Sequence, residues 1–158
     1  MENLDVNFKQ ENNSFNVRVS VIIIKNKKLL VQKRKNDLVW ALPGGKVKIM
    51  EKTEDAIKRE IKEELNVELS NIKIVSVTEN FFRVNNEKIH QYIFTYKGDL
   101  IDDEYDDLEE FGSVEIEKNV IYRWIKLDEI DNFEIRPNNI KEQLENMRYE
   151  NISFYITK

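Results

Sequence analysis

The stretch GKVKIMEKTEDAIKREIKEELNV, which runs from Gly45 to Val67, decides the fold of this chain. Its second half predicts an amphipathic helix over residues 53–65, because apolar side chains recur at the spacing of one helical face. These side chains are Ile57, Ile61 and Leu65. The helix therefore has one stripe to bury, and the rest of the chain must supply an apolar surface against it.

Both ends of the predicted helix carry terminal signals. Thr53 is a residue type that caps helix N-termini, and Asn66 tolerates the left-handed conformation that ends many helices. Upstream, Pro43-Gly44-Gly45 contains three of the chain's six glycine and proline residues. We expect special demands on the backbone at this turn, which leads into the helix.

Three glutamates, Glu60, Glu63 and Glu64, lie within an arc of roughly 100° on the same helix, beside the apolar stripe. Carboxylates in such a place repel one another and need a counter-charge. The lysines nearby on the helix are expected to point elsewhere. We expect a hard divalent cation, Mg²⁺ or Mn²⁺, to supply this counter-charge, because such cations prefer oxygen ligands. The alternative is a charged helix whose carboxylates are simply solvated.

The spacing of the charged residues resembles a known signature. The run Gly45-x5-Glu51-x7-Arg59-Glu60-Ile61-x-Glu63-Glu64-x-Asn66-Val67 is similar to the Nudix box, G-x5-E-x7-R-E-U-x-E-E-x-G-U, where U is a bulky aliphatic residue. Asn66 is the one departure, where the box has glycine. The resemblance covers about residues 15–150. It implies an α/β/α sandwich with a mixed β-sheet between helices, and a metal-dependent hydrolase of nucleoside diphosphates linked to another moiety.

The resemblance also assigns roles within the box. Four residues are expected to bind the metal: Gly45, Glu60, Glu63 and Glu64. Glu51 and Arg59 are expected to form a pair that fixes the loop and orients those ligands. Glu63 is a candidate general base, although members of the family also take the base from outside the box.

An acidic segment over residues 101–112 offers candidates for such a base. Glu104 is the first choice because it is the acid nearest the preceding predicted strand that has the longer reach of a glutamate, and Glu109 and Glu110 are next. A carboxylate that approaches bound cations would have a lowered pKa and could accept a proton. The alternative is a solvated surface loop.

The rest of the chain is expected to form one domain. Residues 1–14 are polar and aperiodic and predict a loose tail, and residues 15–158 predict a single Nudix domain. Strands are expected at residues 16–24, 28–35, 46–49, 72–79, 88–96, 120–125 and 152–156, with a second helix over 137–147. Hairpin-length connections favour a mixed α+β sheet covered by helices over a parallel one.

Composition narrows the function classes. The net charge of −5 argues against a nucleic-acid partner, and the absence of cysteine excludes disulfides and thiolate sites. His90 is the one histidine, so a multi-histidine metal site is excluded, and its own role stays open. No segment predicts a membrane span or a signal peptide. We expect a cytoplasmic enzyme with a small nucleotide-like substrate, and a homodimer stays open.

Two other functions are compatible with the same residues. One is a nucleotide sensor that keeps the fold without turnover, although a sensor does not need all three glutamates. The other is a diphosphatase of non-nucleotide substrates. The box does not identify the substrate, because specificity lies in loops outside it.

Overall fold

The helix expected over residues 53–65 is present in the computed structural model, which describes residues 4–158, as α1 (Thr53–Leu65). Its apolar stripe is buried as predicted, because the side chains of Ile57, Ile61 and Leu65 are 0% exposed. The stripe packs against strands that follow and precede the helix in sequence. The buried face of α1 therefore joins the strands that precede the helix to those that follow it.

One end of α1 agrees with the sequence and the other does not. Asn66 adopts the left-handed conformation, with φ 56° and ψ 34°, as predicted. The prediction of Thr53 as N-cap is wrong, since Lys52 occupies that position without a side-chain bond. The Thr53 hydroxyl instead shares a 2.6 Å hydrogen bond with the Tyr96 hydroxyl, so it joins the helix to a strand rather than capping it.

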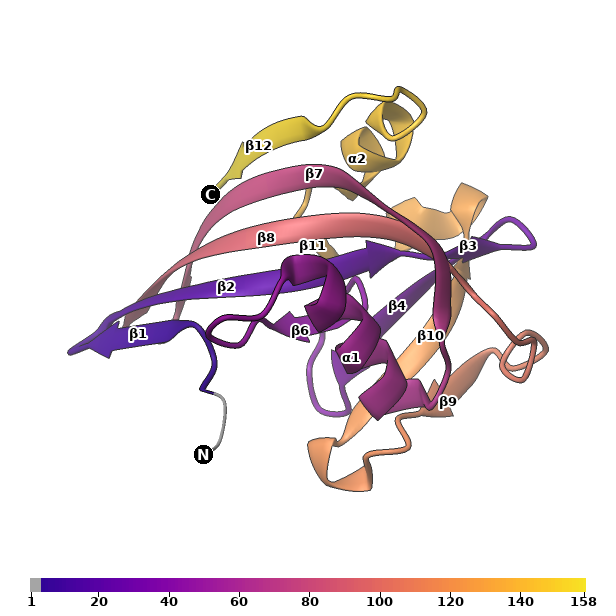
Figure 1. Cartoon of the computed structure of the whole chain (residues 1–158), viewed down its shortest axis with the longest axis horizontal. Coiled ribbons are helices and arrows are strands. Elements are labelled where there is room, and N and C mark those ends of the chain that lie inside the picture. The colour runs from indigo at the N-terminus through magenta and orange to yellow at the C-terminus, as the bar shows by residue number, and fades with distance from the viewer. Residues whose placement is uncertain (1–3) are drawn as a thin grey trace.

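α1 lies on one face of a six-stranded mixed sheet with the order β1-β2-β8-β7-β12, in which β6 also pairs with β2 (Figure 1). The strands are β1 (Asn7–Gln10), β2 (Asn13–Ile22), β6 (Gly44–Lys46), β7 (Leu69–Val84), β8 (Glu87–Leu100) and β12 (Ser153–Thr157). β2 runs parallel to β8, and β7 runs antiparallel to β8. β7 and β8 extend beyond their predicted limits because their pairing continues to the turn at residues 85–86.

A second six-stranded sheet has the order β11-β5-β4-β10-β9, with β3 also paired to β4. Its strands are β3 (Ile24–Lys25), β4 (Lys28–Arg34), β5 (Trp40–Ala41), β9 (Glu110–Gly112), β10 (Val120–Lys126) and β11 (Ile135–Arg136). β3 and β4 form a hairpin across residues 26–27, in agreement with the short connection expected between the strands at 16–24 and 28–35. Short 3₁₀ helices, η1 (Ile116–Lys118) and η2 (Leu127–Asn132), flank β10.

Two apolar clusters hold these layers together. The first joins α1 to both sheets, through residues such as Val21 of β2 and Leu30 of β4. The second joins the sheets to α2 (Ile140–Asn146), through Ile22 and Ile140. The α+β class with mixed pairing is confirmed. The expectation of one sheet needs correction, because the strands divide into two sheets.

The predicted tail over residues 1–14 is only partly a tail. Residues 1–3 lie outside the described residues, but β1 pairs with β2 along its whole length. The Val6 amide also donates to the Val47 carbonyl at 2.7 Å. An edge strand held by backbone bonds needs no apolar alternation, which is why its sequence gave no signal. Within residues 4–158, no helix combines the length and apolar character needed to cross a membrane.

The left-handed Asn66 generates a first prediction. Replacing it with alanine should lower the free energy of unfolding by about 1 kcal/mol, because a Cβ without a hydrogen-bonding side chain is strained there. Asn66→Gly should be at least as stable as the parent. Urea denaturation measures both variants. Equal stability of the alanine and glycine variants would contradict the strain at this residue.

Candidate active site

The box residues surround one cavity of about 1080 Å³. Its wall includes strand β6 at Gly45, one face of α1 and the segment around η1. The box residues that line it are Gly44, Gly45, Arg59, Glu60, Glu63 and Glu64. The structure therefore brings together the four predicted metal ligands, with Glu51 immediately behind them through Arg59.

Arg59 connects three segments at this cavity. Its Nε and Nη2 each donate to a Glu51 carboxylate oxygen at 3.0 Å, and Nη2 also donates to the Lys46 carbonyl at 3.0 Å. Its Nη1 donates to Glu60 at 2.9 Å and to Glu63 at 3.3 Å. Burial opposes the charge, but the hydrogen bonds of Glu51 and the charge of Glu60 hold the pKa of Arg59 above its ordinary value. The expected Glu51–Arg59 contact is present.

Gly45 is required by close approach rather than by its backbone angles. No glycine has a positive φ, yet a Cβ at Gly45 would overlap the Glu60 carboxylate. A Cβ at Gly44 would overlap the Val19 carbonyl of β2. The two glycines therefore let β6 lie directly against a carboxylate of α1 and the backbone of β2. Gly45 and Glu60, which are fifteen positions apart, form one surface of the cavity.

Two of the box carboxylates are buried. Glu60 is 7% exposed and Glu64 is 4% exposed, whereas Glu63 is exposed. Burial raises the pKa of Glu60, against the opposing charge of Arg59. Burial likewise raises the pKa of Glu64, against the opposing hydrogen bond from Tyr122. The site therefore concentrates negative charge where water solvates it poorly, and this charge needs cations.

A lysine from outside the helix, which the sequence analysis did not consider, supplies part of that positive charge. Lys118, at the end of η1, places Nζ 3.9 Å from Glu60 Oε2 and 3.7 Å from Glu64 Oε1. It also lies 3.3 Å from Glu115 Oε2. The lysines of the helix itself do face away, but Lys118 approaches from a distant segment.

Arg59 and Lys118 are the cations that contact the box carboxylates, and the oxygen atoms of these carboxylates are suitable ligands for a metal ion. Among residues 4–158, no group of three acidic or histidine side chains has the spacing of a preformed metal centre. In this arrangement Glu60 and Glu63 are paired with Arg59, and Lys118 lies near Glu60 and Glu64. The donor set is all oxygen, with two buried carboxylates, and this suits a hard divalent cation.

Tyr122, in β10, is a site residue that the sequence reasoning missed. It is 0% exposed, and its hydroxyl donates a short hydrogen bond to Glu64 Oε2. Its ring stacks on Phe111 with centroids 5.6 Å apart, and Phe111 stacks on Tyr105 at 4.4 Å. Tyr105 in turn donates to the Leu65 carbonyl at 2.9 Å. This stack fixes the last turn of α1 and one carboxylate.

The structure does not bring Glu104 to this cavity. Glu104 is exposed and does not line the cavity wall. Glu109 and Glu110 pair with Arg123 at 2.8 Å and 2.7 Å, away from the box. The acids outside the box that line the cavity are Asp5, Asp37, Glu115 and Glu117, and of these Glu115 and Glu117 belong to the segment around η1. Glu115 and Glu117 directly precede the predicted strand at residues 120–125. Their place in the sequence was the one signal that could have identified them as site residues.

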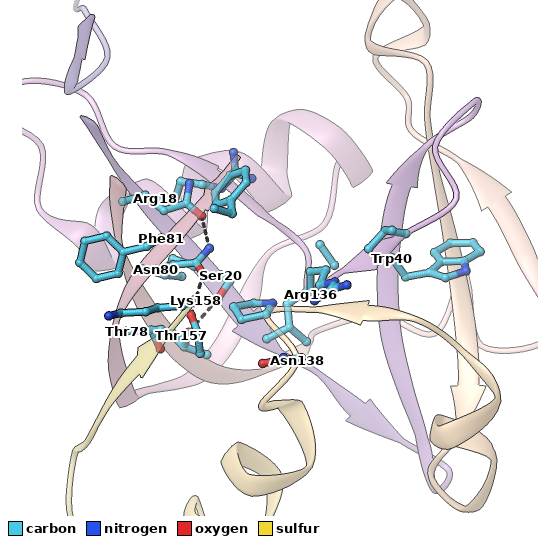
Figure 2. A pocket seen from close by; sticks show the side chains of 18 of the residues that line it. Arg18, Ser20, Trp40, Thr78, Asn80, Phe81, Arg136, Asn138, Thr157 and Lys158 are labelled. Atoms are coloured by element: carbon cyan, nitrogen blue, oxygen red, sulfur yellow. Dashed lines mark hydrogen bonds between the residues drawn. The ribbon is translucent and has the colours of Figure 1, made fainter. Parts of the chain in front are cut away.

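A second cavity, of about 730 Å³, adjoins the first (Figure 2). The two share lining residues: Arg18, Arg34, Asp37, Val39 and Ala41. A chain of side-chain hydrogen bonds crosses four strands on one side of the second cavity. The bonds run from Thr157 to Asn80 at 2.6 Å, from Asn80 to Gln91 at 2.9 Å, and from Gln91 to Asn16 at 3.1 Å.

His90 lines neither cavity. Its ring stacks on Phe81 with centroids 4.4 Å apart and meets Phe15 and Tyr92 edge-on. This aromatic environment favours a packing role for the histidine.

Comparison with known proteins agrees with the geometry. A family model described as the NUDIX domain matches residues 14–146. An 8-oxo-dGTP diphosphatase from Buchnera aphidicola subsp. Schizaphis graminum is 29% identical over 124 residues, 75% of this chain and 82% of that protein. The MutT NUDIX hydrolase from Burkholderia pseudomallei has 25% identity and a TM-score of 0.54 over 84% of this chain and 97% of that one.

A further solved structure supports the fold alone. The mutator MutT protein from Bacillus halodurans has 16% identity, with a TM-score of 0.61 over 90% of each chain. The chain belongs to the Nudix family, as its box indicated. It is a Nudix-type pyrophosphohydrolase, acting on acid anhydrides in phosphorus-containing substrates, and the silent-sensor alternative is therefore set aside.

The close approach at Gly45 generates a second prediction. Gly45→Ala should displace the Glu60 carboxylate and lower kcat at least about tenfold, because a carboxylate of the predicted ligand set would be misplaced. Overpacking should also cost about 1–3 kcal/mol of unfolding free energy. Gly112→Ala is the matched control, since no heavy atom lies within 4 Å of an added Cβ there. Parent-like activity of Gly45→Ala would contradict the contact.

Proposed function

We propose that this enzyme hydrolyses a nucleoside diphosphate linked to another moiety, and that it requires Mg²⁺ or Mn²⁺. The observation that carries the proposal is the pair of buried carboxylates, Glu60 and Glu64, on the wall of an open cavity. Burial penalises each negative charge, so the pair is stabilised by cations. Lys118 approaches both carboxylates only at 3.7–3.9 Å, which leaves room for a stronger interaction with a metal ion.

In this proposal, Glu60, Glu63 and Glu64 hold the metal together with the backbone of Gly45. The metal, when bound, offsets charge on the phosphate oxygens and lowers the pKa of a water molecule. Arg59 keeps two of the three carboxylates oriented while its other donors remain on the loop. Water attacks phosphorus, and the anhydride bond to the leaving phosphate breaks.

Two further roles follow from the shape of the cavity. Arg18 and Arg34 line both cavities, so they face a phosphate chain that passes from one to the other. Glu115 is half-buried on the wall near Lys118, and we propose it as the general base from outside the box. Glu63 is the alternative base within the box. In either case the carboxylate accepts the proton of the attacking water.

The second cavity is the proposed place of the organic moiety. Its amide and hydroxyl side chains, among them Asn80 and Gln91, suit the hydrogen-bonding edge of a nucleobase. The Buchnera relative is named for 8-oxo-dGTP, so nucleoside triphosphates, oxidised ones included, belong in the first tests. The proposal includes action in the cytoplasm on a small nucleotide-like substrate.

A hydrolysis screen tests the substrate class. Nucleoside triphosphates, sugar nucleotides, dinucleotides and dinucleoside polyphosphates are incubated with the protein and Mg²⁺, and released phosphates are quantified. We expect turnover of at least one nucleotide class that EDTA abolishes. Turnover confined to non-nucleotide diphosphates, such as inositol or isoprenoid diphosphates, would contradict the nucleotide assignment.

The metal site generates a third prediction. Glu63→Gln/Glu64→Gln should fold, because it removes repelling charges while glutamine still accepts from Tyr122. Activity should fall at least about 10²-fold, and Mn²⁺ binding measured by electron paramagnetic resonance should be lost. The matched control is Glu54→Gln/Asp55→Asn, which removes two exposed carboxylates of the same helix. Equal Mn²⁺ binding by the two double variants would overturn the site.

A further inference from the structure

Arginine is concentrated at the second cavity. The chain has seven arginines, and four of them line this one cavity. They are Arg18, Arg34, Arg83 and Arg136. Asp37 is the only acidic residue on the same wall, although acids outnumber bases in the chain as a whole. The cavity therefore has the opposite charge balance to the molecule around it, and this points to an anionic ligand.

Two of the arginines face the part of the substrate that is proposed to react. Arg18 and Arg34 also line the cavity of the box carboxylates. Burial lowers the pKa of Arg18 and the charge of Arg34 adds to this effect, while Glu60 and Glu64 oppose it. Both guanidinium groups thus belong to the wall that also carries Glu60 and Glu64. A phosphate in the chain being cleaved is enough to account for them.

The other two arginines need a different partner. Arg83 and Arg136 line the second cavity and not the first. Arg83 lies opposite Lys88 in the β7–β8 register, so two like charges face each other across the strands. Arg136 is paired with Glu134 at 2.5 Å, but the pair is more than half exposed and contributes little stability. A phosphate held at the metal does not neutralise either group.

We infer that the moiety entering the second cavity is a nucleotide with a phosphate on its own sugar, at the 2′ or 3′ oxygen, in addition to the diphosphate that is cleaved. This inference rests on the proposed function. The hydrogen-bonded side chains at Asn80 and Thr157 suit a base, and Figure 2 shows them gathered round the cavity with Arg136. Guanidinium groups bind phosphate through paired, charge-assisted hydrogen bonds. A nucleoside without a sugar phosphate would leave Arg83 and Arg136 unused.

Calorimetry without metal tests the inference separately from catalysis. Adenosine and guanosine 5′-monophosphates are compared with the corresponding 2′,5′- and 3′,5′-bisphosphates. We expect at least one bisphosphate to bind about tenfold or more tightly than its monophosphate, because each charge-assisted bond contributes on this scale. The advantage should shrink as salt is raised. Equal affinity for monophosphates and bisphosphates, or no binding of either, would overturn the inference.

Variants assign the extra affinity to the two arginines. Arg83→Gln/Arg136→Gln should bind the bisphosphate no more tightly than the monophosphate, with monophosphate affinity unchanged; each single variant should lose part of the preference. Arg148→Gln is the matched control, because Arg148 is exposed and lines neither cavity. A double variant that keeps the full preference would overturn the assignment. Absence of hydrolysis in the Mg²⁺ screen would overturn the proposed function instead, whatever the calorimetry shows.

Discussion

The hydrogen bonds of Arg59 are the interaction on which the site depends. One guanidinium offers five donors in a rigid plane, and here they reach Glu51 on the loop before the helix, the backbone of β6, and two carboxylates of α1. A loop, a strand and a helix are thereby fixed relative to one another by a single side chain. A lysine offers only a point charge and does not span these three segments.

The other contacts of the site arise from the burial of two carboxylates. Glu60 and Glu64 are buried on the same helix, so each needs a partner of its own. Glu60 accepts a hydrogen bond from Arg59 and lies against Gly45, where there is no side chain in its way. Glu64 accepts a hydrogen bond from the Tyr122 hydroxyl. The pKa values of both carboxylates are raised by burial, and a divalent cation would lower them again by favouring the ionised forms. Arg59 and Tyr122 thus each hold one of the two buried carboxylates in place.

Local periodicity and fixed spacing made half of this site predictable from sequence. The limits of α1, the left-handed Asn66 and the Glu51–Arg59 contact all lie within one 23-residue stretch. Tyr122 was not predictable, because it reaches Glu64 across 58 positions and through the pairing of distant strands. Lys118 was not predicted either, because it also approaches the carboxylates from a segment that is distant in sequence.

The points at which the structure differs from the sequence predictions have separate physical origins. The choice of Glu104 relied on the abundance of acids in a segment, which says nothing about where that segment lies. Its neighbours Glu109 and Glu110 already have a partner in Arg123, a contact between segments that charge counting does not show. The strand β1 was missed because edge strands are held by backbone bonds, which any polar sequence can make.

The measurement that tests this account most directly is a double-mutant cycle of Glu51→Ala and Arg59→Ala, with Mn²⁺ affinity and unfolding free energy as the two readouts. The account predicts strong coupling: each single variant weakens Mn²⁺ binding about 10–100-fold, and the double variant is little worse than either. The unfolding free energies should show coupling of about 1–3 kcal/mol. Additive effects in both readouts would contradict the claim that this pair orients the carboxylates.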